Sequence, residues 1–227
     1  MVTVAIIPAR GQSTALPRKN LRRIDGRPLI AYTIDAARAA SLVDRIVVST
    51  DDDAIARAAL AAGAEVPFRR PSRLATDTAP TVDAVLHAVD ELERSGAKLD
   101  DVVTLQPTSP FRTGRMIDDA ISLMRRVGAD SAVSVAALDA PISVLGYLDN
   151  GAFVTLARLA DGRRQAAPTA YRLTGGIYVT SRNLLRTGVL VGGRPAAIVL
   201  DGLAAMDIDT KEDLEAARRG LSSVRAR

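Results

Sequence analysis

The chain has 227 residues, 48% of them apolar, a length and composition that support one substantial hydrophobic core. Cysteine is absent, which excludes disulfides, thiolate metal sites and a cysteine nucleophile. The net charge of +4 with three Phe, four Tyr and no Trp argues against a nucleic-acid surface and favours small anionic ligands. No run reaches the ~20 apolar residues that span a bilayer, and the opening run lacks the features of a signal peptide. We therefore expect a cytoplasmic protein with neither a membrane nor a nucleic-acid partner.

Short apolar runs alternate with helix-period segments along most of the chain. The expected strands are 2–8, 45–50, 101–106, 131–135, 176–179 and 196–200. The expected helices, in which apolar positions recur at three and four residues, are 27–40, 52–63, 79–96 and 114–128. This alternation predicts an α/β fold, a Rossmann-like three-layer sandwich with a mainly parallel sheet, and a single domain over residues 1–227.

The alternation lapses between Leu138 and Thr174. Two short alternating runs there flank Asp149, Asn150 and Gly151, a sequence typical of a hairpin turn. We expect a small antiparallel insertion over 138–174 that serves as a lid or as a subunit contact. A plain surface excursion explains the pattern equally well.

The first expected strand is followed by a loop that carries Arg10, Arg18 and Lys19. A loop at the carboxyl end of a parallel strand lies where open α/β sheets bind ligands. The three cations, with the backbone amides between Gly11 and Ser13, would suit a polyphosphate. The loop matches neither GxGxxG nor GxxxxGK[ST], so a solvated turn that happens to carry cations is an equal alternative on the residues alone.

Near the end of the chain, Asp207 and Asp209 are two residues apart. On an extended segment both carboxylates then face the same side. Thr210 and Asp213 have the spacing of a capping box that opens the last helix. Paired carboxylates suit Mg²⁺, which bridges substrate phosphates. The alternative, that Asp209 only favours the helix N-terminus, leaves Asp207 unexplained.

The opening segment "IIPARGQSTALPRKN" resembles that of the CMP-sialic acid (acylneuraminate) synthetase family of cytidylyltransferases, where the usual form is close to "IIPARGGSKGIPRKN". Segments 44–56, 70–80, 105–113, 171–179 and 206–217 resemble the same family in the same order. The resemblance implies a nucleotidyltransferase domain that transfers CMP from CTP to an acidic sugar, a sialic acid-like 2-keto acid, and releases pyrophosphate. It also implies Mg²⁺ as cofactor and a homodimer.

The same resemblance implies roles for individual residues. The expected nucleotide contacts are Arg10, Gly11, Ser13, Arg18, Lys19, Asn20, Arg70 and Thr81. The expected catalytic residues are Arg10, Lys19 and Asp209. The expected acceptor contacts are Gln106, Arg164 and Tyr178, and the expected metal ligands are Asp207 and Asp209.

Several of these residues have ordinary structural alternatives. Asn20 would cap a helix or a turn, Arg70 would be a surface charge, and Thr81 would cap the helix that follows it. Arg112 is expected to pair with the next helix rather than to contact an anion. His87 is expected on a helix face with no chemical role.

Four positions depart from the family pattern. Thr14 and Ala15 stand where Lys and Gly are usual, Ser143 stands where sialic acid enzymes usually carry a lysine, and Thr174 replaces a common Asn. Three of these departures bear on contacts to the acceptor or the leaving group, whereas the nucleotide-side motifs "RKN", "RP" and "DID" persist. Two other functions therefore stay open: a cytidylyltransferase that activates a small phosphonate, and a non-catalytic nucleotide-binding relative.

Overall fold

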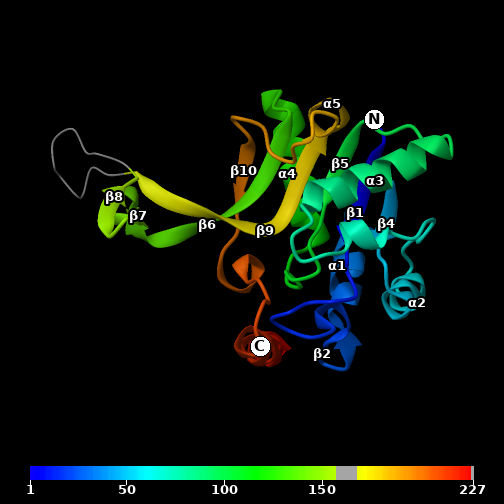
Figure 1. Ribbon diagram of the computed structural model, residues 1–227, viewed down its shortest axis with the longest axis horizontal. Helices are drawn as coiled ribbons and strands as arrows, with labels where there is room; N and C mark the ends of the chain where they lie inside the picture. The colour runs from blue at the N-terminus through cyan, green and yellow to red at the C-terminus, as the bar shows by residue number, and fades with distance from the viewer. Residues whose placement is uncertain (157–167, 226–227) are drawn as a thin grey trace.

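A six-stranded sheet forms the centre of the computed structural model, which describes residues 1–156 and 168–225. Its strand order is β10-β6-β9-β5-β1-β4. The strands are β1 (Thr3–Pro8), β4 (Arg45–Ser49), β5 (Asp101–Thr104), β6 (Ser131–Pro141), β9 (Thr169–Ser181) and β10 (Ala196–Val199). β1 is parallel to β4 and β5, and β10 is parallel to β6, whereas β9 runs antiparallel to β5 and β6. The predicted mainly parallel sheet is confirmed, with β9 as its antiparallel member (Figure 1).

Helices cover both faces of this sheet. The helices are α1 (Leu29–Arg38), α2 (Asp53–Ala61), α3 (Thr81–Arg94), α4 (Gly114–Val127), α5 (Arg182–Leu185) and α6 (Lys211–Arg225). α1, α2 and α4 bury their apolar sides in one core cluster with β1, β5 and β9. α3 and α5 pack in a second cluster on the opposite face. The predicted three-layer α/β sandwich is confirmed.

The composition of β1 follows from its central place. Ala5 and Ile7 belong to the first core cluster, whereas Val4 and Ile6 belong to the second. Because successive side chains of a strand point to opposite faces, a strand covered on both sides must be apolar throughout. This explains why 2–8 reads as a continuous apolar run rather than an alternating one.

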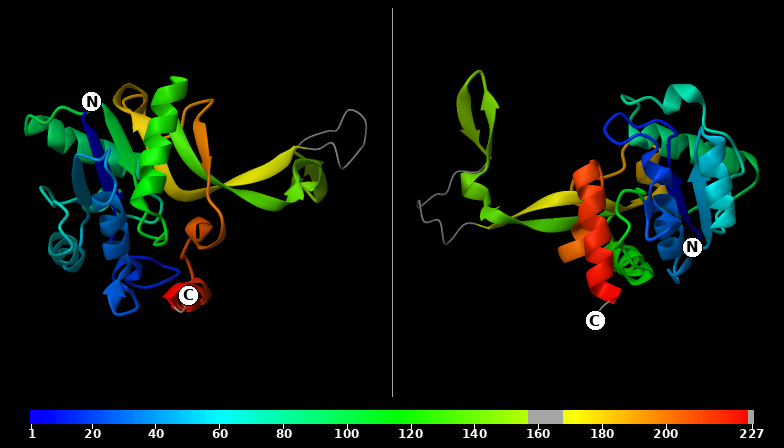
Figure 2. Two further views of the ribbon diagram at one scale, coloured as in Figure 1. Left: turned by 180° about the vertical axis from the view of Figure 1, so that it is seen from behind. Right: turned by 90° about the horizontal axis from the view of Figure 1, so that it is seen from below.

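An arm extends from this sandwich. The outer halves of β6 and β9 leave the sheet as a two-stranded ribbon that carries the hairpin of β7 (Gly146–Asp149) and β8 (Ala152–Thr155) (Figures 1 and 2). Positive φ angles of 47° at Asn150 and 85° at Gly151 form its turn, as the sequence predicted. The predicted insertion 138–174 is longer than the hairpin, because its two ends are parts of β6 and β9.

The last helix returns to the beginning of the chain. Leu214 and Ala217 of α6 pack with Leu16 and Leu29, so α6 supports the loop that follows β1 (Figure 2). That loop contains the short 3-10 helix η1 (Lys19–Leu21) and the two-residue strands β2 (Arg23–Ile24) and β3 (Arg27–Pro28). Further 3-10 helices in the described part of the chain are η2 (Ser72–Leu74), η3 (Ile142–Val144) and η5 (Gly202–Ala205). Within the described ranges, no helix is both long and apolar enough to cross a bilayer.

Candidate active site

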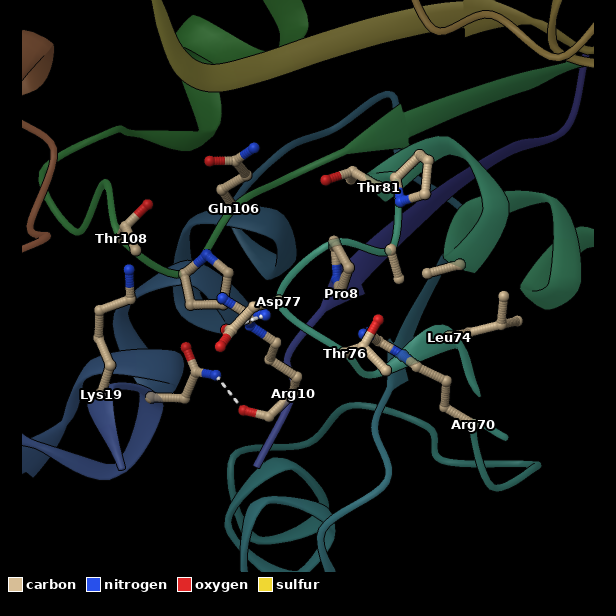
Figure 3. Close-up of a pocket in the computed structure, with 15 residues that line it drawn as sticks. Pro8, Arg10, Lys19, Arg70, Leu74, Thr76, Asp77, Thr81, Gln106 and Thr108 are labelled. Carbon is tan, nitrogen blue, oxygen red and sulfur yellow. Dashed lines mark hydrogen bonds and ion pairs between the residues drawn. The ribbon is translucent and has the colours of Figure 1, made fainter. Parts of the chain in front are cut away.

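A cavity of about 220 Å³ opens at the carboxyl ends of β1 and β5 (Figure 3). This is the edge at which parallel α/β sheets bind ligands, because the connecting loops diverge there. Its lining residues are Pro8, Arg10, Lys19, Asn20, Arg70, Leu74, Thr76, Asp77, Ala79, Pro80, Thr81, Ala84, Gln106, Pro107 and Thr108. Six of the predicted site residues, Arg10, Lys19, Asn20, Arg70, Thr81 and Gln106, are therefore brought together around one cavity.

Arg10 extends into the cavity directly after β1. Its Nη1 atom lies 2.5 Å from Oδ1 of Asp77, which belongs to the segment between η2 and α3. The Arg10 carbonyl accepts a hydrogen bond of 2.9 Å from Nδ2 of Asn20. Because Asn20 is buried, this bond fixes the course of the loop from the inside. The Asn20 side chain therefore crosslinks two distant parts of the loop. It does not cap the neighbouring turn.

Arg70 is a buried cation at the back of the cavity. Its Nε atom donates to Oγ of Ser49 over 3.1 Å, and its Nη2 atom donates to the Ser49 carbonyl. Burial lowers the pKa of Arg70 to about 10, with Asp51 opposing and Arg10 adding to that shift. At 5% exposure Arg70 is not the surface charge that the alternative required. A cation held this way is presented to the cavity in a fixed orientation.

Thr81 lies at the first position of α3, beside the cavity (Figure 3). Pro80 is the N-cap residue, and no side chain makes a capping hydrogen bond there. Proline is compatible with a helix start because the first turn leaves backbone N–H groups unpaired. The capping alternative for Thr81 is therefore wrong, and its hydroxyl faces the cavity.

Lys19 connects the cavity to the segment before α6. Its Nζ atom lies 2.8 Å from Oδ1 of Asp209. The Asp209 carboxylate is thus an ion-pair partner and takes no part in capping. Capping is done by Thr210 and Asp213, whose side chains each accept from the other's backbone N–H, at 3.1 and 2.8 Å. The predicted capping box is confirmed.

Asp207 is half-buried beside Lys19 and Asp209. Its Oδ1 atom is fully buried and has no hydrogen-bond partner among the described residues. Burial raises the pKa of Asp207, and the neighbouring carboxylate of Asp209 adds to this. The Thr108 hydroxyl near this carboxyl group and the Lys19 ammonium oppose the shift. A buried carboxylate oxygen without a donor is costly unless a cation approaches it. Asp207 is therefore poised to receive one.

The bend in β9 brings a third element to the same place. A Cβ atom on Gly175, whose φ is 75°, would lie 3.1 Å from Oε1 of Gln106 and 3.8 Å from Oδ2 of Asp207. Tyr178 is half-buried on the same strand, and burial together with Asp207 raises its pKa. Tyr178 does not line the cavity, but it lies close enough to Asp207 for that carboxylate to contribute to the raised tyrosine pKa.

Arg112 is buried beneath this bend. Its guanidinium donates to the carbonyls of Gln106 and Gly176, and over 2.9 Å to Oγ1 of Thr33 in α1. Burial lowers the pKa of Arg112 to about 9, and Asp207 opposes that shift. The structural role is therefore correct, although Arg112 holds backbone carbonyls together and is not an ion-pair partner of the next helix.

Three of the predicted nucleotide contacts lie outside the main cavity. Gly11, Ser13 and Arg18 line a neighbouring hollow of about 260 Å³, with Gln12, Thr14, Pro17 and Asp77. The Gly11 N–H donates to Oδ1 of Asp51 over 2.9 Å, so this amide supports the loop instead of pointing to a ligand. A Cβ atom at Gly11 would lie 2.8 Å from Cβ of Asp52, which requires glycine there.

The remaining predictions have mixed outcomes. Arg164 lies outside the described residues. His87 lies on α3 and packs edge-on against Phe68, with 5.3 Å between the ring centroids, in agreement with a helix-face residue. Thr174 is buried, and its hydroxyl is 2.6 Å from that of Ser134, so it joins β6 to β9. Ser143 lies in η3 on the arm and does not line the cavity.

A family model described as Cytidylyltransferase matches residues 4–183, which include every residue of the main cavity. The chain belongs to the cytidylyltransferase family. It is therefore a nucleotidyltransferase enzyme, and the interpretation as a non-catalytic relative loses its support.

Similar proteins cover nearly the whole of this cytidylyltransferase. It is 35% identical over 217 residues to a CMP-N,N'-diacetyllegionaminic acid synthase of Legionella pneumophila, covering 94% of this chain and 93% of that protein. It is 32% identical over 221 residues to a pseudaminic acid cytidylyltransferase of Campylobacter jejuni, covering 96% and 95%. The resemblance predicted from the motifs is confirmed.

Among solved structures, the cytidylyltransferase is similar to a CMP:2-keto-3-deoxy-manno-octonic acid synthetase complexed with CTP. The TM-score is 0.74 at 20% identity, and the alignment covers 98% of this chain and 99% of that one. At this identity the similarity shows the fold, which is of the nucleotidyltransferase type.

Three polar lining residues of the cytidylyltransferase cavity were not predicted from the sequence: Thr76, Asp77 and Thr108. Asp77 is the one acidic residue in segment 70–80, which was singled out for other positions. Asp77 could have been predicted because it lies between Arg70 and Thr81, two positions expected to face the nucleotide.

Proposed function

We propose that this enzyme transfers CMP from CTP to a sialic acid-like 2-keto sugar acid and releases pyrophosphate. The observation that carries the proposal is the convergence of Arg10, Lys19 and Arg70 on one cavity, next to the carboxylates of Asp207 and Asp209. The names of the relatives support the sugar acid, since both are CMP-sugar acid enzymes.

The chemistry is displacement at phosphorus. An acceptor oxygen forms a bond to the α-phosphorus of CTP, the bond from that phosphorus to the β-phosphate oxygen breaks, and the acceptor hydroxyl proton leaves to solvent. Such a step depends mainly on alignment and on stabilising charge on the phosphoryl oxygens. Lys19 and Arg10 supply that charge stabilisation. Arg70, held by Ser49, and Asn20, held by the Arg10 carbonyl, would position the nucleoside of CTP.

The acceptor would approach from the bend of β9. Gln106 lines the cavity just after the end of β5 (Figure 3). Tyr178 lies on the adjacent strand β9, near Asp207. Both side chains carry hydrogen-bonding groups suited to a polyhydroxy acid. Gly175 leaves the space between Gln106 and Asp207 open.

Asp207 and Asp209 fit Mg²⁺. Their oxygens are the hard ligands that this ion prefers, and the buried Asp207 Oδ1 has no partner in the described structure. The described residues contain no group of three or more acidic or imidazole side chains that would enclose a metal. Two carboxylates therefore suit an ion that arrives with the triphosphate and keeps phosphate and water ligands. When bound, Mg²⁺ neutralises charge on the phosphates.

We further propose that the enzyme is a homodimer that pairs through its arm. Tyr147, Leu148 and Phe153 on the β7–β8 hairpin are exposed, as are Tyr171 and Leu173 on β9. Exposed apolar side chains gathered on one projecting element are typical of an interaction site. The arm would then serve as the dimer contact.

A pyrophosphate-release screen tests the proposal. Sialic, legionaminic and pseudaminic acids, 3-deoxy-octulosonate and several phosphonates are each offered with CTP, UTP, ATP or GTP. We expect turnover with CTP and at least one sugar acid. Turnover with phosphonates alone would replace the sugar acid with the phosphonate alternative, and better turnover with UTP or ATP would contradict the CTP assignment.

A further inference from the structure

Asp77 is an acidic side chain in a site that has to bind an anion. Its Oδ1 atom lies 2.5 Å from Nη1 of Arg10. It also lines both the main cavity and the neighbouring hollow, and among the described lining residues it alone is common to the two. Asp77 thus stands at the boundary between the nucleoside end of the site and the loop of Gly11 to Arg18.

A second cation of the cavity, Lys19, is also paired with a carboxylate, but the surroundings of that carboxylate differ from those of Asp77. Asp209 pairs with Lys19, but it also lies beside Asp207, where a divalent ion would draw it away from Lys19. Asp77 belongs to the segment between η2 and α3 and faces Arg10. A phosphate that binds Arg10 must therefore compete with the Asp77 carboxylate directly.

We infer that Asp77 is a counter-ion that competes with the phosphates of CTP and of pyrophosphate for the Arg10 guanidinium, and that it lowers the affinity for both. The inference rests on the proposed function. The pair is partly exposed, 32% for Arg10 and 48% for Asp77, so it is weak enough to be exchanged for a phosphate contact.

The competition has a consequence for turnover. Pyrophosphate keeps the contacts to Arg10 that the triphosphate made, so its departure would be slow if the guanidinium were left unpaired. Asp77 takes back Arg10 as the product leaves, which favours release. Product release limits the turnover of many enzymes, so a carboxylate at this point would affect the rate as well as the affinity.

Calorimetry with Mg²⁺ and pyrophosphate, and separately with CTP, tests the inference without any acceptor. Asp77→Asn keeps the side chain's size and removes its charge. We expect it to bind pyrophosphate ~2- to 5-fold more tightly than the unchanged enzyme, the scale of one exposed ion pair. Loss of a residue that merely supports the loop would weaken binding, so the sign of the effect is diagnostic.

Two controls sharpen the experiment. Asp83→Asn removes an exposed charge six positions away, in the first turn of α3 and outside the cavity, and should leave pyrophosphate affinity unchanged. In an Arg10→Gln background, Asp77→Asn should have no further effect, because the competition acts through Arg10. Asp77→Ser repeats the test with a second uncharged side chain.

Equal or weaker pyrophosphate binding by the Asp77 variants would overturn the inference, and so would equal tightening by Asp83→Asn. If the unchanged chain binds neither CTP nor pyrophosphate, both the inference and the proposed function fail. An enzyme that binds both but accepts no sugar acid contradicts the proposed acceptor alone and leaves the Asp77 result standing.

Discussion

Lys19 and Asp209 are 190 positions apart in the sequence, and their side chains meet at 2.8 Å. This contact joins the loop after β1 to the segment that opens α6. It also pairs a cation with a carboxylate, and the proposed reaction uses these two groups separately. Lys19 would turn to the phosphates and Asp209 to Mg²⁺ as the metal–nucleotide complex binds, so both partners are exchanged in one event.

The first prediction concerns Lys19. Lys19→Ala should lower kcat/KM at least ~10²-fold, because one preorganised charge on the phosphoryl oxygens supplies a few kcal/mol to the transition state. Steady-state pyrophosphate release measures it. Lys98→Ala, an exposed lysine before β5 and outside the cavity, is the matched control. A loss of less than threefold would assign Lys19 to a solvated turn.

The second prediction separates stability from activity at Asp207. Burial raises the folded-state pKa of this carboxyl above its ordinary value of 3.8. Its contribution to stability is therefore present below pH 3.8 and is lost as the pH rises through the folded pKa. Asp207→Asn removes the buried charge, so at pH 7.5 the variant should unfold at a higher temperature than the unchanged protein. That gain should disappear near pH 3.8.

The same substitution should damage catalysis. Removing a metal ligand should reduce Mg²⁺-dependent turnover at least ~10²-fold while the protein stays folded. Thermal unfolding at several pH values, together with a Mg²⁺ titration of activity, measures both effects. Normal turnover across the titration would show that the metal lies elsewhere, and a lower unfolding temperature at pH 7.5 would contradict the burial argument.

Most of the fold was predictable from the sequence because the buried positions of each helix and strand form a pattern within that segment. The continuous apolar run of β1 and the helical periodicity of α3 and α4 depend on which faces are buried, and those faces recur at regular intervals. The direction of β9 was not predictable. Its pairing with β5 and β6 is made between residues far apart in the chain, and no local pattern distinguishes a parallel from an antiparallel partner.

The charged residues of the site were predictable from the sequence, but the residues that pair with them were not. Arg10, Lys19 and Arg70 were expected at a nucleotide and do line one cavity. Their partners were not foreseen, since Asp77 and Ser49 approach them from other segments. A sequence shows which groups are charged, whereas the partner of each charge depends on how the loops converge.

The third prediction tests the bend of β9. Gly175 has a φ of 75°, and a Cβ atom there would lie 3.1 Å from Oε1 of Gln106. Gly175→Ala should cost ~1–2 kcal/mol of unfolding free energy through the left-handed backbone, and should raise the acceptor KM by displacing Gln106. Gly176→Ala is the control, because Gly176 is not in that conformation and its Cβ would approach Ser134 and Thr174 at 3.4 Å. An acceptor KM changed equally by both variants would contradict this placement of Gln106.

The last prediction concerns the arm. Leu148 is 76% exposed and Phe153 58% exposed, and the two are paired across the β7–β8 hairpin. Leu148→Asp with Phe153→Asp places two charges on a surface that would be buried in a dimer, where an unpaired charge is costly. Sedimentation at micromolar concentration should show a dimer for the unchanged protein and a monomer for the double variant. Leu60→Asp, on the exposed side of α2, should leave the dimer intact. A monomeric unchanged protein, or a double variant that remains dimeric, would rule out pairing through the arm.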